Sequence, residues 1–282
     1  MRASEQPGAP PSGLGVVGTA LESGRQTLLL LRHRRFGWLV ALALGALGAL
    51  AFVLAARAHE RLDGRTLYCL LAWWVLGTVV VPWSTLYLGV QAVHGELEDR
   101  TSQYLFLRPI GRVPLLLGKW LAVVAASALI GVGGAAILLV AVGAHGQLWP
   151  DGVDLSLFAA FALVLTLGGA AYAAVAMFFG ATFRRPLAWA AFFVVGVQML
   201  AANLPVSAGF RQLTITDPLR RMVLDRVEPD GRLARILWPA EREFRPDDIG
   251  EPLTNLLWFL GTCLLLAAWR YARTEYESRA RD

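Results

Sequence analysis

The sequence predicts an all-α integral membrane protein with six transmembrane helices and both termini in the cytoplasm. Three observations support this fold class. The 282 residues are 56% hydrophobic and 17% charged, with a mean hydropathy of +0.52, whereas a soluble domain carries about 25% charged residues. Apolar runs long enough to cross a bilayer recur along the chain. Arginines gather at some of the connections between these runs and not at others, which indicates one orientation.

Residues 1–35 are predicted to form a cytoplasmic N-terminus with an amphipathic helix. Apolar residues recur at helical spacing from Leu14 to Leu31, which is typical of a helix that lies along the membrane surface. An ordinary leader into the first span fits this pattern equally well. The apolar run that follows is longer than the roughly 7–15 residues of a signal-peptide core, so it indicates a membrane anchor rather than a cleaved segment.

A transmembrane domain is predicted over residues 36–269, followed by a cytoplasmic tail at 270–282. The apolar cores of its runs contain no Asp, Glu, Lys or Arg, and the core of the third begins after Lys119. Pro82 lies near the middle of the second run and predicts a kink there. The predicted spans are 36–56, 67–93, 115–143, 155–183, 187–204 and 253–269.

The short connections set the predicted orientation. Basic residues precede the first run, separate the fourth from the fifth and follow the sixth, whereas the turn after the third run has only Asp151 and Asp154. The turn at 57–66, with three arginines against two acids, disagrees with this pattern. The positive-inside rule places 94–119 in the cytoplasm and 205–252 outside. Apolar residues within 205–252 predict a small ordered cap with a helix near Pro218–Val227.

The composition excludes several classes of protein. Charge-free spans argue against ion-coupled transport, because intramembrane charges are costly and persist for function. Cys69 and Cys263 both lie in apolar runs, and the histidines lack metal-ligand spacing, so no disulfide, metal site or catalytic residue is predicted. No basic patch predicts nucleic-acid binding. Gly118-Lys119 approaches a phosphate-binding loop, but Val113 and Trp120 replace its first glycine and its hydroxyl residue, so the chain is not expected to bind ATP.

The charged segment at 95–114 interrupts the apolar runs and precedes Lys119, the sole lysine. Its apolar and aromatic residues fall at helical spacing up to Pro109, which ends the helix, and Pro114 opens the next one. A solvated loop needs no such amphipathic helix. The segment therefore predicts a cytoplasmic docking surface, which we call the coupling segment.

The coupling segment resembles the hallmark region of type 2 ABC exporter permeases. That region has an acidic pair and Thr, a leucine-rich helix, a proline-arginine turn and Leu-Gly-Lys. Arg100 stands where many members have glycine. Asp217-Pro218 with Arg220 and Arg221 is also similar to an element of the subgroup that includes the nitrous-oxide-reductase maturation permease, with Asp in place of Asn. The hallmark positions here are Glu98, Asp99, Thr101, Leu105, Leu107, Pro109, Arg112, Leu117, Gly118 and Lys119.

The resemblance implies a permease subunit in the cell membrane that forms an export path with a second permease chain, in a homodimer. Two cytoplasmic ABC ATPase subunits would bind the ATP and Mg, and this chain would hold no cofactor. Gly118 and Lys119 would form a structural motif at the inner surface. Further expected partners are membrane lipids and an extracytoplasmic accessory protein. The residues implied at the ATPase interface are Glu98, Asp99, Arg100, Thr101, Tyr104, Leu105, Arg108, Pro109 and Arg112.

Two rival functions are open at this stage. A membrane anchor or assembly factor would recruit partners through 205–252. An intramembrane enzyme would need converging polar groups, although such groups more often form hydrogen bonds between helices. The candidates are Gln91, Tyr172, Gln198, Asn203 and Asn255. Polar residues within the spans are predicted to line a transport path, and packing between helices explains them equally well. These residues are Ser84, Thr85, Gln91, Gln198 and Asn203.

Overall fold

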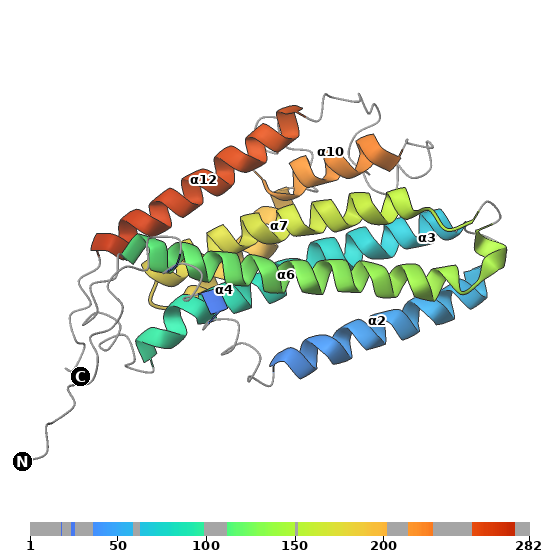
Figure 1. The fold of residues 1–282 in the computed structure, drawn as a ribbon, viewed down its shortest axis with the longest axis horizontal. Helices are drawn as coiled ribbons and strands as arrows, with labels where there is room; N and C mark the ends of the chain where they lie inside the picture. Colours follow the sequence, from blue (N-terminus) through green and yellow to red (C-terminus); the bar gives the residue numbers. More distant parts are fainter. Residues whose placement is uncertain are drawn as a thin grey trace, which may run out of the picture.

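The predicted all-α architecture is confirmed. The computed structural model describes residues 18, 24–25, 36–58, 63–98, 112–149, 152–201, 214–227 and 250–273, and every regular element within these ranges is helical. The elements lie largely along one direction in a bundle (Figure 1). In chain order they are α2 (Phe36–Ala58), α3 (Gly64–Leu71), η1 (Ala72–Val80), α4 (Val81–Glu98), α6 (Arg112–Gly143), η2 (Gly146–Leu148), α7 (Leu155–Thr182), α8 (Pro186–Phe192), η3 (Phe193–Ala201), α10 (Thr216–Val227) and α12 (Gly250–Arg273).

Five helices among the described residues are long and apolar enough to cross a membrane. They correspond to the first four and the last of the predicted spans, with ends that extend beyond the charge-free runs, as at Arg112 and Arg273. The run predicted at 187–204 is helical as α8 and η3, but its apolar helix, Pro186–Gln198, is shorter than the other five. The five helices are Gly37–Arg57, Gly64–Val93, Arg112–Gly143, Leu155–Thr182 and Gly250–Arg273.

The irregularity expected at Pro82 takes the form of a π-helix. The π-helical segment η1 ends at Val80, and the amide of Val81 donates to the carbonyl of Leu76, five residues earlier. Proline has no amide hydrogen to continue an α-helical ladder, and its ring crowds the preceding turn. A wider turn before Pro82 relieves that crowding while the helix continues into α4.

Helix α7 lies at the centre of the bundle. It packs against α4, α6, α10 and α12, and most of its residues from Val164 to Met177 are buried. Small residues permit this close approach: a Cβ on Gly89 of α4 would overlap the Cβ of Ala176 on α7. In contrast, α2 lies at the edge of the bundle (Figure 1), where Trp38 is 83% exposed. Such a face suits lipid or another protein rather than water.

One end of the bundle gathers the ends of several helices. The C-terminal ends of α4, α7 and α12 and the start of α6 share a hydrophobic cluster that includes Val93, Leu116, Met177 and Tyr271. This is the left end in Figure 1. The guanidinium of Arg112 donates to the carbonyl of Ala272 at 2.9 Å. The segment between α4 and α6 therefore starts and finishes at this end of the bundle.

Asp154 caps the start of α7 at the opposite end. Its carboxylate accepts hydrogen bonds from the amides of Ser156 and Leu157 at 2.9 and 3.3 Å, and from the Ser156 hydroxyl at 2.6 Å. Without Asp154, these two amides of the first helical turn would lack a hydrogen-bond partner within the helix. The hydrogen bond from the Ser156 hydroxyl, with the amide donors, holds the pKa of Asp154 below its ordinary value of 3.8.

An Asp154→Ala variant is expected to lose about 1 kcal/mol of stability, because the cap is removed. Since the folded-state pKa is lowered, the stabilisation is present above the unfolded pKa and is lost as the pH falls through the folded value. Thermal unfolding in detergent at pH 7 and under acidic conditions measures both effects. Asp154→Asn, which keeps an oxygen acceptor, should retain most of the stability; an equal loss in both variants would contradict the capping role.

Helix α10 lies inside the bundle rather than in a separate cap. A helix is present where the sequence predicted one near Pro218–Val227, and it lies between α7 and α12 (Figure 1). Ile215 and Val223 are fully buried, and Leu219 reaches Gly168 at the middle of α7. The predicted helix is therefore present, and its apolar stripe packs on α7. Residues 202–213 and 228–249 lie outside the described residues.

Candidate functional site

A cavity of about 160 Å³ lies where α10 meets the other helices. Its wall combines aromatic and apolar surface with hydroxyl, amide and guanidinium groups. A largely apolar wall with a few convergent polar groups is typical of small-molecule binding sites. The lining residues are Trp74, Thr78, Tyr172, Val194, Gln198, Thr216 and Arg220.

Both π-helical segments contribute to this cavity. Trp74 and Thr78 come from η1, and Val194 and Gln198 come from η3. Within η1 the Thr78 hydroxyl donates to the carbonyl of Trp74, which supplies a partner to the widened turn. π-Helical turns often occur at functional sites, because they alter the direction of side chains along an otherwise regular helix. Two of them at one cavity mark it as the leading candidate site within the described residues.

Gln198 joins η3 to the first turn of α10. Its side-chain oxygen, Oε1, accepts from the amides of Ile215 and Thr216 at 3.1 and 3.2 Å and from the Thr216 hydroxyl at 3.0 Å. The first amides of a helix lack partners within the helix, and burial makes a missing partner costly. Gln198 is 3% exposed. It therefore holds the start of α10 against η3 and fixes one wall of the cavity.

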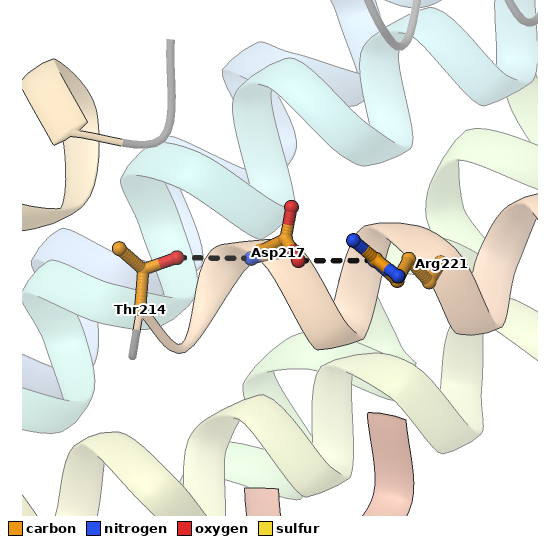
Figure 2. A network of polar contacts seen from close by, with 3 residues as sticks. All are labelled: Thr214, Asp217 and Arg221. Atoms are coloured by element: carbon orange, nitrogen blue, oxygen red, sulfur yellow. Dashed lines mark hydrogen bonds and ion pairs between the residues drawn. The ribbon is translucent and has the colours of Figure 1, made fainter. Parts of the chain in front are cut away.

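Thr214 and Asp217 complete the start of α10. The Thr214 hydroxyl accepts from the amide of Asp217 at 3.3 Å, and Asp217 Oδ2 accepts from Arg221 Nε at 3.0 Å, as Figure 2 shows. The first contact is the hydrogen bond of a helix N-cap, and the second is an ion pair one turn apart. Asp217 is only 4% exposed. Local sequence thus begins the helix, and Gln198 attaches it to the bundle.

Arg220 places a positive charge in the interior. It is 2% exposed, and its guanidinium lies 5.5 Å from the ring centroid of Trp73. A cation over an aromatic face is stabilised by the ring quadrupole. The apolar spans lack charge as predicted, but α10 brings Arg220 and Asp217 between them. The interior therefore contains charges although the spans do not, because these charges come from a segment outside the predicted spans.

The residues predicted to line a path fall into different environments. Gln198 lines the cavity, whereas Ser84 and Thr85 do not. The Thr85 and Ser127 hydroxyls, both fully buried, are 2.6 Å apart and join α4 to α6, and Ser84 donates to the carbonyl of Val81 at 3.2 Å. Gln91 is half-buried on α4. Asn203 lies outside the described residues.

Most of the predicted ATPase interface lies outside the described residues. Glu98 is the last residue of α4, and Asp99, Arg100, Thr101, Tyr104, Leu105, Arg108 and Pro109 follow it in the undescribed segment. Arg112 is described at the start of α6, where it contacts Ala272. The structure places the two ends of this segment, Glu98 and Arg112, at one end of the bundle.

Gly118 and Lys119 are buried at the same end. Lys119 is 1% exposed, and its Nζ lies 5.9 Å from the ring centroid of Tyr271 on α12. The backbone of Gly24 passes close to Gly118, whose carbonyl oxygen would lie 3.0 Å from a Cβ at position 24. Gly24 and Arg25 are helical. The rest of the predicted amphipathic helix at 14–31, apart from Gly18, lies outside the described residues.

Several cavity residues were not assigned to a site from the sequence. Trp74 and Thr78 sit in an apolar run with no local motif, and Thr216 and Arg220 were placed in an external segment. The sequence does carry one signal for the latter: Thr214-Ile215-Thr216-Asp217 fits the capping-box pattern ahead of an apolar stripe. A capped helix with buried-type residues on one face indicates packing against the bundle rather than a polar loop.

The long apolar helices and their buried polar site define a multi-pass helical membrane protein. Residues 32–218 match the family described as ABC-2 family transporter protein, and the chain belongs to that family. It is thus a permease of the ABC transporters, a membrane component of transport rather than an enzyme. No curated protein matches the chain.

Proposed function

We propose that the chain is the permease subunit of an ATP-driven exporter whose energy enters through the coupling segment. The observation that carries this proposal is the position of that segment's two ends. Helix α4 ends at Glu98 and α6 begins at Arg112, at the end of the bundle where Arg270 and Arg273 close α12. The positive-inside rule makes this arginine-bearing end cytoplasmic. A cytoplasmic ATPase would meet the coupling segment there.

The proposed topology has six spans with both termini in the cytoplasm. The five long helices supply five spans, and α8 with η3 supplies the remaining one over Pro186–Ala201. Arg184 and Arg185 lie between the end of α7 and the start of α8. In Figure 1 the end of α7 lies at the same end of the bundle as the ends of α4 and α12. In Figure 1, α2 and α12 run in opposite directions along the bundle, which agrees with an even number of spans.

Force from the ATPase has a physical route into the bundle. Arg112 links the start of α6 to the last turn of α12, and Lys119, two turns further along α6, lies beside Tyr271. A displacement of the coupling segment would therefore move α6 and α12 together. In this proposal two copies of the chain form the path, and ATP and Mg are bound by two ATPase subunits. This chain binds neither.

The rival function as an assembly factor gains no support from the described part of 205–252. Ile215 and, on α10, Leu219 and Val223 are buried where this helix packs against α7 and α12, so their apolar side chains are unavailable to an external partner. Their role is internal.

Co-purification from native membranes tests the proposed function. A tagged wild-type chain is expected to retain an ABC ATPase subunit and vanadate-sensitive ATP hydrolysis. The Glu98→Arg, Tyr104→Ala double variant should bind the ATPase at least about tenfold more weakly, because a buried hot spot and a charge pair each contribute about 1–3 kcal/mol or more to the binding free energy.

Glu251→Arg is the matched control, because it makes the same charge reversal in the first turn of α12, the end of that helix away from Arg273. It should retain the ATPase as the wild type does. Retention of the ATPase by the double variant, with a folded bundle, would contradict the proposed coupling role.

A further inference from the structure

We propose that the cavity between η1, η3, α7 and α10 is a binding site for a small oxyanion, either a carboxylate or a phosphate group. The site goes beyond the proposed function and stands without it, since it rests on the side chains that line the cavity. Three observations support it: a buried amide donor without a partner among the described residues, a cationic wall and a suitable volume.

The donor is the side-chain nitrogen Nε2 of Gln198. Oε1 of the same amide accepts from two backbone amides, which are donors only, so the amide cannot be reversed without placing donor against donor. Nε2 must therefore face away from α10. It is buried and has no hydrogen-bond partner among the described residues, in a side chain that is 3% exposed and lines the cavity. A buried NH₂ group in this position calls for an acceptor from a ligand.

The charge of the wall selects an anion over a neutral acceptor. Arg220 is the charged residue among those that line the cavity, and it is 2% exposed. None of the described residues that line the cavity is acidic. Hydrogen bonds from a guanidinium or an amide to an ionised oxygen are stronger than those to a neutral one, and more so away from water.

The volume limits the size of the ligand. A cavity of about 150 Å³ is large enough to hold benzene, and this one measures about 160 Å³. About six non-hydrogen atoms therefore fit, as in butyrate or in the phosphate of a lipid headgroup. Trp74, Tyr172 and Val194 supply apolar and aromatic surface for a short carbon chain beside the oxyanion.

Calorimetric titration of the purified full-length chain in a neutral detergent tests the site. The probes are butyrate and inorganic phosphate, and butyramide is the neutral control with the shape of butyrate. We expect at least one anion to bind and butyramide not to bind. Gln198→Glu keeps an acceptor for the α10 amides but replaces the NH₂ donor with a negative charge, so it should weaken anion binding about tenfold or more.

Arg220→Gln should weaken binding to a similar degree. The matched control is Arg270→Gln, which removes the same charge from the last turn of α12 and does not line the cavity; its affinity should equal that of the wild type. Melting curves establish that each variant is folded. The proposal is overturned if Gln198→Glu, once shown to be folded, binds the anions as the wild type does, or if butyramide binds as well as butyrate.

Two sources of the oxyanion are separated by repeating the titration in nanodiscs. If phosphatidylglycerol in the disc blocks butyrate binding in the wild type, and native mass spectrometry finds it retained by the wild type but not by Gln198→Glu, the ligand is a lipid headgroup. If butyrate or phosphate binds equally with and without phosphatidylglycerol, the ligand is a soluble anion. Absence of both anion binding and Gln198-dependent lipid retention would refute the site.

Discussion

A Gly89→Leu variant is expected to lose most of its folded protein. Position 89 faces α7 where a Cβ alone would overlap the Cβ of Ala176, so a leucine forces α4 and α7 apart along an extensive helix contact. Overpacking of this kind costs about 3 kcal/mol, the upper part of the usual range, because backbone rather than a flexible side chain must move. Size-exclusion chromatography and thermal unfolding in detergent measure the loss.

Gly133→Leu provides the matched control. Gly133 lies on α6, where a Cβ added to the glycine would meet no atom within 4 Å, so the same substitution enters open space. Its melting temperature should stay near that of the wild type. Equal losses at positions 89 and 133 would show that glycine itself, and not the α4–α7 contact, is what the fold requires.

A Gln198→Leu variant is expected to detach the start of α10. Leucine has a similar volume but no acceptor, so the buried amides of Ile215 and Thr216 lose their side-chain partner. Each unsatisfied buried group costs roughly 1–3 kcal/mol, which gives about 2–6 kcal/mol for the two. Hydrogen exchange is the direct measurement: both amides should exchange faster, while exchange in the centre of α7 changes less.

Gln198→Glu tests whether an acceptor oxygen at position 198 is enough to protect the two amides from exchange. A carboxylate accepts from both amides and is favoured at a helix N-terminus, so their protection should be close to that of the wild type. If Gln198→Leu retained full protection of Ile215 and Thr216, the anchoring role of Gln198 would be wrong.

The sequence predicted the long helices well because their signal is local. Uninterrupted apolar residues over about 20 positions have few alternatives to a membrane helix, and α2, α6, α7 and α12 overlap the predicted spans. The second helix extends to Glu98 beyond its predicted end at 93. Such boundaries depend on capping and packing rather than on hydropathy.

The cavity was largely hidden because its signals are not local. Arg220 and Asp217 give α10 the composition of a segment exposed to water. The residue that anchors α10 in the bundle is Gln198, which lies 18 residues before Thr216 in the sequence. Hydrophobic periodicity also carries no mark of a π-helix such as η3, and the partnership of Thr85 with Ser127 depends on how two helices meet. Gln198 was identified as a candidate because a polar residue in an apolar run is visible without knowledge of the fold.

The central claim is that the coupling segment contacts an ATPase, and site-specific cross-linking tests it most directly. In native membranes, a chain with Cys69 and Cys263 replaced by alanine would carry Thr101→Cys labelled with a benzophenone maleimide. Illumination is predicted to yield an adduct with an ABC ATPase subunit, identified by mass spectrometry, whereas Glu251→Cys in the first turn of α12 yields none. No ATPase adduct at position 101, or equal adducts at both positions, would contradict the claim.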